Sequence, residues 1–184
     1  MTKFFKNLYR LLLIGSPLFI ILNYIRNFLP NYKTKKKSKK IENIIYEKFQ
    51  SVNYNQKWFC NNLYYLSTNF KNLKNVKNIL EIGSYEGRSA IFFLKNFSDS
   101  NITCVDTWAG SDEHSSVNFE LIEKNFDFNT AFYQSNNNLM KHKMTSNEFF
   151  KENHRYFDLI YIDGDHSSDQ VKIDLINSWN VLKN

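Results

Sequence analysis

The chain has 184 residues, of which 42% are hydrophobic and 17% aromatic, enough for one packed domain with an appendage. Its formal net charge is +6, which is the charge of a single lysine cluster (Lys33, Lys35, Lys36, Lys37, Lys39 and Lys40). The rest of the chain is therefore near neutral, and no nucleic-acid-binding domain is expected. Two cysteines, Cys60 and Cys104, are too few for a disulfide framework or a cysteine-based metal site, and they favour a reducing, cytoplasmic compartment.

Residues 1–40 are predicted to form an apolar segment followed by a lysine-rich linker. The apolar run lies between Arg10 and Arg26, which is shorter than the roughly 20 residues of a membrane-spanning helix. No small-x-small cleavage site follows it, which argues against a signal peptide. A short membrane anchor, an interfacial helix and a helical arm packed on the domain remain open. The lysines favour contact with an anionic membrane surface, and a solvated linker is the alternative.

Residues 41–77 are predicted to form a helical N-terminal extension. Apolar residues recur there at helical spacing, as in Ile41, Ile44 and Ile45 and again in Phe59, Leu63 and Leu66. We expect these helices to cover an edge or a face of the following sheet.

Residues 78–184 alternate between strand and helix patterns. This alternation predicts an α/β fold with a doubly wound, Rossmann-like parallel sheet covered on both faces. The predicted strands are 78–83, 101–106, 140–144 and 157–163, and the predicted helices are 87–96, 116–126, 146–153 and 168–182.

The fourth strand carries a continuous apolar run, Leu159 to Ile162, which predicts burial on both faces inside a sheet. In the usual doubly wound order this strand lies beside the first strand and has a further neighbour on its other side. No strand pattern follows it before Asn184. The sequence therefore suggests a C-terminally truncated domain or one that depends on a partner, and truncation is favoured.

The turn after the first strand reads Glu81-Ile-Gly-Ser-Tyr-Glu-Gly-Arg-Ser89. Gly83 and Gly87 at a strand-to-helix turn are typical of nucleotide-binding units, because glycines let the backbone approach a ligand closely. Tyr85 stands where dinucleotide enzymes have a glycine that admits a pyrophosphate, which favours a smaller ligand. Ser84 belongs to the same turn, and an ordinary capped turn is the alternative.

The second strand ends in Asp106-Thr107-Trp108. An acid at this position can accept hydrogen bonds from the two hydroxyls of a ribose, and Trp108 could shield a base. The alternative for Asp106 is a turn cap. After the third strand, Ser146 stands at a predicted helix start, where it could cap the helix or touch an adenine edge.

The fourth strand runs into Asp163-Gly-Asp165-His166. Ligands of open α/β sheets bind beyond the carboxyl ends of the strands, so these groups should face the same crevice as Gly83 and Asp106. They could act as a general base toward a substrate hydroxyl or ligate a divalent metal such as magnesium. The alternative is a turn in which Asp163 caps and His166 only packs.

With these sites in chain order, residues 78–184 resemble class I S-adenosylmethionine-dependent methyltransferases. The resemblance is to the branch with a Glu-Ile-Gly-x-x-x-Gly-x-Ser turn and an Ile-Asp-Gly-x-His end to the fourth strand. It implies S-adenosylmethionine as the cofactor and a seven-stranded sheet, with a divalent metal in some relatives. The implied cofactor-binding residues are Glu81, Gly83, Ser84, Tyr85, Gly87, Asp106, Thr107, Trp108, Ser146 and Asp163.

The implied catalytic residues are Asp163 and His166, and Asp163, Asp165 and His166 would be the metal ligands. Strands five to seven of that family have no counterpart in the chain. The expected reaction is methyl transfer to an oxygen of a small molecule or sugar. Two alternatives remain: a metal-dependent glycosyltransferase-like enzyme using Asp163-Gly-Asp165, which leaves the turn unexplained, and an inactive methyltransferase remnant.

Overall fold

The computed structural model describes residues 34–44, 53–55, 59–60, 63–70, 72–110 and 118–183. Strands and helices alternate along the chain from β1 onward, so the predicted α/β class is confirmed. The elements are α3 (Leu63–Phe70), β1 (Asn78–Ile82), α4 (Arg88–Asn96), β2 (Asn101–Asp106), α5 (Phe119–Ser135), β3 (Leu139–Lys143), α6 (Ser146–Glu152), β4 (Leu159–Ile162) and α7 (Ser168–Val181).

The four strands form one parallel sheet in the order β3-β2-β1-β4. Ile79 of β1 pairs with Ile102 of β2 on one side and with Leu159 of β4 on the other. The chain therefore moves outward through β2 and β3 and then returns to the opposite side of β1. Such a reversal of direction opens a crevice beyond the carboxyl ends of the strands, where open α/β sheets bind ligands.

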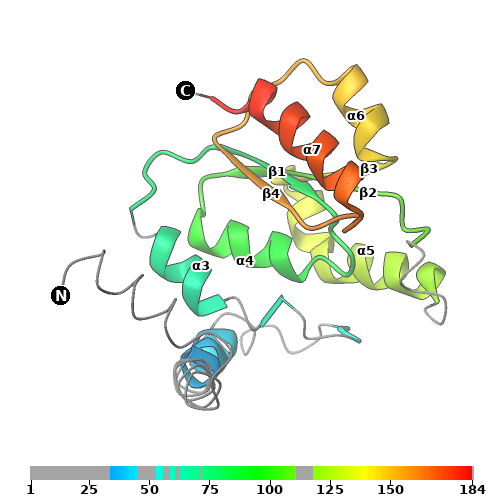
Figure 1. Ribbon diagram of the computed structural model, residues 1–184. Coiled ribbons are helices and arrows are strands. Elements are labelled where there is room, and N and C mark those ends of the chain that lie inside the picture. Colours follow the sequence, from blue (N-terminus) through cyan, green and yellow to red (C-terminus); the bar gives the residue numbers. More distant parts are fainter. Residues whose placement is uncertain are drawn as a thin grey trace, which may run out of the picture.

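Helices cover both faces of this sheet (Figure 1), with α3, α4 and α5 on one side and α6 and α7 on the other. Because successive side chains of a strand point to opposite faces, β1 contributes to two separate cores. Ile79 packs in the larger core with α4 and α5, whereas Leu80 packs in the smaller core with Phe149 of α6.

The larger core is built around aromatic rings. Phe92 and Phe93 of α4 are fully buried, and their ring centroids lie 5.4 and 6.3 Å from that of Phe59. Phe70 at the end of α3 lies 5.9 Å from Phe92, so α3 is held on α4 by the same cluster. Edge-to-face and tilted arrangements of this kind add to the free energy of apolar burial. Phe59 and α3 of the N-terminal extension are thus part of the packed domain.

The prediction that β4 is buried on both faces is wrong, whereas its predicted place beside β1 is confirmed. All four of its side chains, from Leu159 to Ile162, are only half-buried. The reason is that β4 lies at an edge of the described sheet, so it has one strand neighbour where an interior strand has two.

The predicted end of the helix near residue 126 is also wrong, because α5 continues to Ser135. The polar residues Asn125, Asn129 and Thr130 are buried on its inner face, where an apolar periodicity would have shown the helix continuing. Asn125 and Asn129 donate hydrogen bonds to Glu86, which explains why polar side chains occupy this face.

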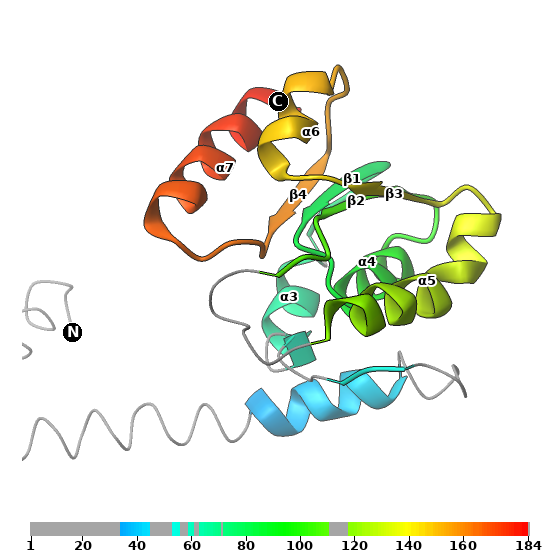
Figure 2. The ribbon, with the colours of Figure 1, turned by 90° about the vertical axis from the view of Figure 1, so that its right-hand side faces the viewer.

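The described part of the lysine-rich segment is helical over residues 34–44, where a linker was expected. Thr34 and Ser38 are buried one turn apart, and Lys35 to Lys37 point outward. The Tyr64 backbone N–H donates to Ser38 Oγ at 3.1 Å, which fixes this helix beside α3 (Figure 2). Within the described ranges no helix has the length and apolarity needed to cross a bilayer, and the apolar run before Arg26 lies outside them.

Candidate active site

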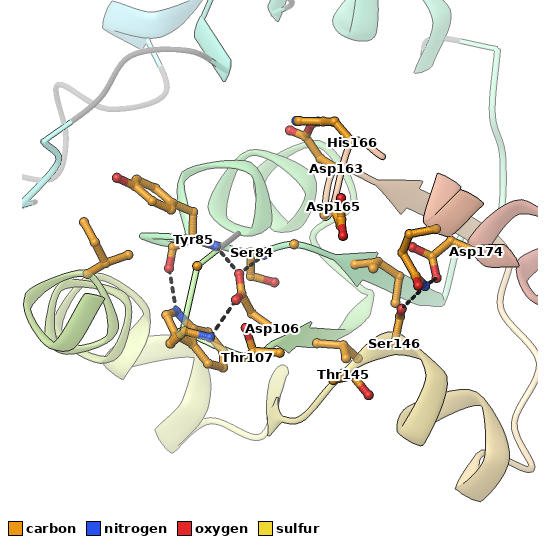
Figure 3. Close-up of a pocket in the computed structure, with 18 of the residues that line it drawn as sticks. Ser84, Tyr85, Asp106, Thr107, Thr145, Ser146, Asp163, Asp165, His166 and Asp174 are labelled. Atoms are coloured by element: carbon orange, nitrogen blue, oxygen red, sulfur yellow. Dashed lines mark hydrogen bonds between the residues drawn. The ribbon is translucent and has the colours of Figure 1, made fainter. Parts of the chain in front are cut away.

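A cavity of about 1020 Å³ opens at the carboxyl ends of β1, β2 and β4 (Figure 3). Its wall is formed by the turn after β1, the end of β2, the start of α6 and the loop between β4 and α7. A volume near the upper end of the roughly 300–1,000 Å³ typical of ligand pockets suits a ligand the size of a nucleoside with an extended substituent. The four sequence sites, at Gly83, Asp106, Ser146 and Asp163, all line this one cavity.

Gly83 brings two parts of the wall together. Its φ of +85° lies in the left-handed region, and a Cβ built on it would lie 2.2 Å from the Asp163 backbone oxygen. No other residue fits there, because the end of β4 occupies the space that a side chain needs. Glycine at position 83 therefore allows the turn after β1 to pack closely against the backbone at the end of β4, which places Asp163 directly beside the turn.

The carboxylate of Asp106 organises the backbone of this turn. Its Oδ2 accepts hydrogen bonds from the backbone N–H groups of Ser84 and Tyr85, both at 2.9 Å, and Oδ1 accepts from Trp108 N–H at 2.8 Å. A carboxylate has about four acceptor positions. Three are used within the protein, so Asp106 has room for one further donor from a ligand, where the sequence predicted two ribose hydroxyls.

Trp108 is part of the cavity wall and is held there on several sides. Its indole N–H donates to the Tyr85 carbonyl at 2.8 Å, its ring centroid lies 4.8 Å from that of Phe126, and the Lys141 ammonium lies 4.6 Å from the ring centre. The side chain is only 4% exposed. Thr107, its predicted companion, lines the cavity as well.

Glu81 lies beneath the cavity and does not form part of its wall. The side chain is fully buried in the α4 face of the sheet, where Cys104 Sγ lies 3.5 Å from Oε2. Burial disfavours the charged form and raises the pKa of Glu81 to about 7. A carboxyl group in this position supports the turn from below.

The loop after β4 carries Asp163, Asp165 and His166, which line the cavity and are exposed. Tyr161 donates a hydrogen bond from its hydroxyl to Asp163 Oδ2 at 3.1 Å, which leaves Oδ1 without a described protein partner. Asp165 Oδ1 accepts the Ser167 backbone N–H at 2.7 Å and so caps the turn into α7. Figure 3 shows the three side chains at one edge of the cavity.

The predicted metal site is not assembled. Among the described residues no three His, Cys, Asp or Glu side chains are grouped so that they could hold a metal ion. Asp165 is committed to its turn, and the oxygen atoms and imidazole of its neighbours do not converge on one point as metal ligands must. The residues that the structure describes therefore do not fit a metal.

Sequence reasoning missed Glu86, which lines the cavity and is 2% exposed. Asn125 Nδ2 donates to its Oε1 and the Asn55 backbone N–H to its Oε2, both at 2.8 Å. Glu86 belongs to the glycine turn after β1, but nothing in the sequence indicated that the Asn55 backbone would donate a hydrogen bond to it. Glu86 thereby ties the N-terminal extension to the cavity rim.

Arg88 was missed for the same reason. Its Nη1 donates to Cys60 Sγ at 2.8 Å and to Glu42 Oε1 at 3.2 Å, and its guanidinium lies 3.9 Å from the centre of the Tyr54 ring. Burial raises the pKa of Cys60 to about 11, so this thiol stays protonated beside the guanidinium. Arg88 lines the cavity and connects it to three separate stretches of the extension.

Gln170 and Asp174 of α7 complete the wall on the side of Ser146. The Gln170 side-chain amide donates to Ser146 Oγ at 3.1 Å and to Asp174 Oδ1 at 2.9 Å. A signal for these residues was present: Gln170, Asp174 and Ser178 recur every fourth residue, as one polar stripe on a helix.

A family model described as a methyltransferase domain matches residues 80–184. This match covers more than half of the chain, from within β1 through β2, β3 and β4. The chain therefore belongs to this methyltransferase family, as a class I domain whose cofactor is S-adenosylmethionine.

Solved structures resemble the chain at low identity. A Staphylococcus aureus protein assigned as a caffeoyl-CoA O-methyltransferase is 21% identical over 88% of this chain and 69% of its own, with a TM-score of 0.49. A Bacillus cereus O-methyltransferase in complex with SAH is 14% identical over 82% and 62%, with a TM-score of 0.44. An Agrobacterium tumefaciens SAM-dependent methyltransferase is 12% identical over 65% and 39%, with a TM-score of 0.48.

The chain thus spans between 39% and 69% of the length of these three proteins. No curated protein matches the chain.

Proposed function

We propose that the protein transfers the methyl group of S-adenosylmethionine to an oxygen atom of a small-molecule or sugar acceptor. The observation that carries the proposal is that the turn after β1, the acid after β2, the serine after β3 and the acid after β4 line one cavity. Membership of the methyltransferase family supports the same reading.

The chain's own residues would divide the cavity into two parts. Asp106 would accept one ribose hydroxyl, Ser146 would lie at the adenine, and the backbone of Gly83 and Ser84 would border the methionine part. Trp108 is buried at the ribose side, where it would exclude water from the base. The remaining part, between Asp163 and Glu86, is left for the acceptor.

The cofactor, when bound, supplies an electrophilic methyl group on a positively charged sulfur. The reaction breaks the S–CH₃ bond and forms an O–CH₃ bond in line with it, so most of the catalysis comes from positioning. The acceptor hydroxyl must also lose its proton. Asp163 Oδ1, which is free of the Tyr161 hydroxyl, and the His166 imidazole are the proposed bases at that edge of the cavity.

The cofactor site is tested by thermal unfolding of the chain with and without S-adenosylhomocysteine, the demethylated product. At 100 times its dissociation constant the ligand adds about 2.7 kcal/mol to the free energy of unfolding, so the midpoint rises. Uridine diphosphate with Mn²⁺ serves as the comparison ligand. A shift with that pair and none with S-adenosylhomocysteine would overturn the proposal in favour of a glycosyltransferase-like enzyme.

The chemistry is tested by following S-adenosylhomocysteine formation in the presence of phenolic and sugar acceptors. Asp163→Asn and His166→Gln should each keep the ligand-induced shift, and the variant that removes the base should lose about a hundredfold or more in rate. Asp169→Asn, which removes an exposed acid in the first turn of α7, is the matched control and should react normally. Full activity in both site variants would exclude these residues as the base.

A further inference from the structure

A chain of polar side chains connects α7 with the start of α6 along the wall of the cavity. Gln170 occupies its centre, with Nε2 at 2.9 Å from Asp174 Oδ1, 3.1 Å from Ser146 Oγ and 3.3 Å from Asn147 Oδ1. Asn147 Nδ2 in turn donates to Gln170 Oε1 at 3.4 Å. All four residues line the cavity, and Figure 3 shows Asp174 beside Ser146.

Asp174 sets the direction of every hydrogen bond in this chain. Asp174 Oδ1 accepts the hydrogen bond that Gln170 Nε2 donates, so the amide nitrogen of Gln170 faces the carboxyl group. The same nitrogen then donates to Ser146 Oγ, which acts as an acceptor in that bond. With its oxygen facing Gln170, the Ser146 hydroxyl donates to no acceptor among the described residues, and its proton is left for the cavity.

Packing does not explain why an acid stands at position 174. The side chain is 1% exposed, and its Oδ2 has no hydrogen-bond partner within the described part of the chain. A buried carboxylate oxygen without a partner is destabilising by more than an ordinary unpaired group. A role in presenting Ser146 to a ligand accounts for a residue that weakens the fold.

We infer that Asp174 and Gln170 are positioning residues that make Ser146 a hydrogen-bond donor to N1 of the cofactor's adenine. The inference rests on the proposed function, which puts the ribose at Asp106 and the base toward α6. N1 lies on the edge of a purine farthest from the ribose, and it is an acceptor that matches a hydroxyl donor. If these hydrogen bonds ran in the opposite direction, Ser146 would donate to Gln170 and could only accept a hydrogen bond from the cofactor. It would then no longer match N1, which is itself an acceptor.

Two analogues of S-adenosylhomocysteine isolate this contact. The 1-deaza analogue replaces N1 by C–H, and the 3-deaza analogue makes the same change at N3, which the inferred contact does not involve. In calorimetric titrations of the full chain, the 1-deaza analogue should bind about tenfold more weakly than S-adenosylhomocysteine, and the 3-deaza analogue about equally well.

Variants then test the positioning residues. In Asp174→Asn the new amide can donate or accept a hydrogen bond, so the Gln170 amide can rotate by 180°. The affinity for S-adenosylhomocysteine relative to the 1-deaza analogue should then fall from about tenfold to about twofold. Ser146→Ala should reduce this affinity ratio to about one. Asp169→Asn removes a charge from the same helix at an exposed position and should keep it at tenfold. A purely structural role of Asp174 would change all affinities together and leave the ratio unchanged.

The outcomes separate this inference from the function on which it rests. Absence of S-adenosylhomocysteine binding overturns both. Binding with no preference for N1, or a preference that survives in Asp174→Asn, overturns the inference and leaves the function standing. Should Asp174→Asn fail to fold, Gln170→Met breaks the same chain: a ratio near two supports the inference, and a ratio of ten overturns it.

Discussion

Helices α4 and α7 cover opposite faces of the same sheet, yet they bury opposite kinds of side chain. On α4 the fully buried residues include Phe92 and Phe93, whereas the buried residues of α7 are Asp174 and Ser178. The outward side of α7 carries large apolar residues instead, and Trp179 is 78% exposed. Hydrophobic burial therefore explains the position of α4, whereas α7 contributes the partly buried Val181 to the smaller core.

Polar contacts hold α7 at both ends. Gln170 joins it to α6, and near its C-terminus Val181 accepts the Phe157 N–H at 2.9 Å while Lys183 pairs with Asp158 at 2.8 Å. The α4 face of the domain provides stability, and the α7 face provides a polar wall for the cavity. Four substitutions test this difference, from the largest expected effect to the smallest.

Phe92→Ala should weaken the domain most. The ring is fully buried against Phe59, Phe70 and Phe93, so its removal leaves a cavity in the larger core and should lower the free energy of unfolding by about 3–5 kcal/mol. Trp179→Ala, on the outer side of α7, should change it by less than about 0.5 kcal/mol. Urea denaturation of both variants gives the comparison, and similar losses in the two would contradict it.

Glu81→Gln tests an acid that the α4 face buries deeply. Because folding raises its pKa from 4.5 to about 7, the folded state binds the proton more tightly than the unfolded state. The resulting stabilisation is complete below about pH 4.5 and is lost as the pH rises through 7, a difference of about 3 kcal/mol. Wild type should lose this amount relative to the glutamine variant between pH 4.5 and pH 8, measured by urea denaturation. Parallel pH profiles would show that Glu81 titrates normally.

Asp106→Asn tests the point where the two faces meet at the cavity. The amide can replace only part of the three hydrogen bonds that the carboxylate accepts, and its NH₂ group would face a backbone donor. We expect a loss of about 2 kcal/mol in the free energy of unfolding and weaker binding of S-adenosylhomocysteine. Asp99→Asn is the control, since this acid is exposed, pairs with Lys77 at 3.5 Å and accepts a hydrogen bond from the Ser98 hydroxyl at 3.4 Å. Equal effects of the two changes would remove the assigned role of Asp106.

Ser178→Ala should have the smallest effect. The hydroxyl of Ser178 is buried and has no partner among the described residues, so its removal should raise the free energy of unfolding or change it by less than about 1 kcal/mol. Ser100→Ala is the matched control, because Ser100 Oγ donates to the Val76 carbonyl at 2.6 Å and its loss should be destabilising by about 1–2 kcal/mol. Calorimetric unfolding resolves the two. A large loss in Ser178→Ala would mean that the polar interior of α7 stabilises the fold.

Local patterns in the sequence were sufficient for the strands and for the place of β4 beside β1. The alternation of apolar strands with amphipathic helices located β1 to β4 within about two residues, and the usual doubly wound order correctly put β4 beside β1. The extent of α5 was missed because Asn125 and Asn129 are polar residues that happen to be buried. Periodicity detects apolar faces, and a polar face packed on Glu86 gives no such signal.

The sequence by itself determined the fold class, the family and the four chain positions that meet at the cavity, because strand ends and glycine turns are local features. Tertiary structure alone decided what each side chain does there. It directed Asp106 to three backbone N–H groups, placed Glu81 below the cavity, and kept Asp163, Asp165 and His166 from forming a metal site. It also joined Asp174 to Ser146 across two helices. The direction of these hydrogen bonds depends on residues that are far apart in the sequence, so a local sequence pattern does not predict it.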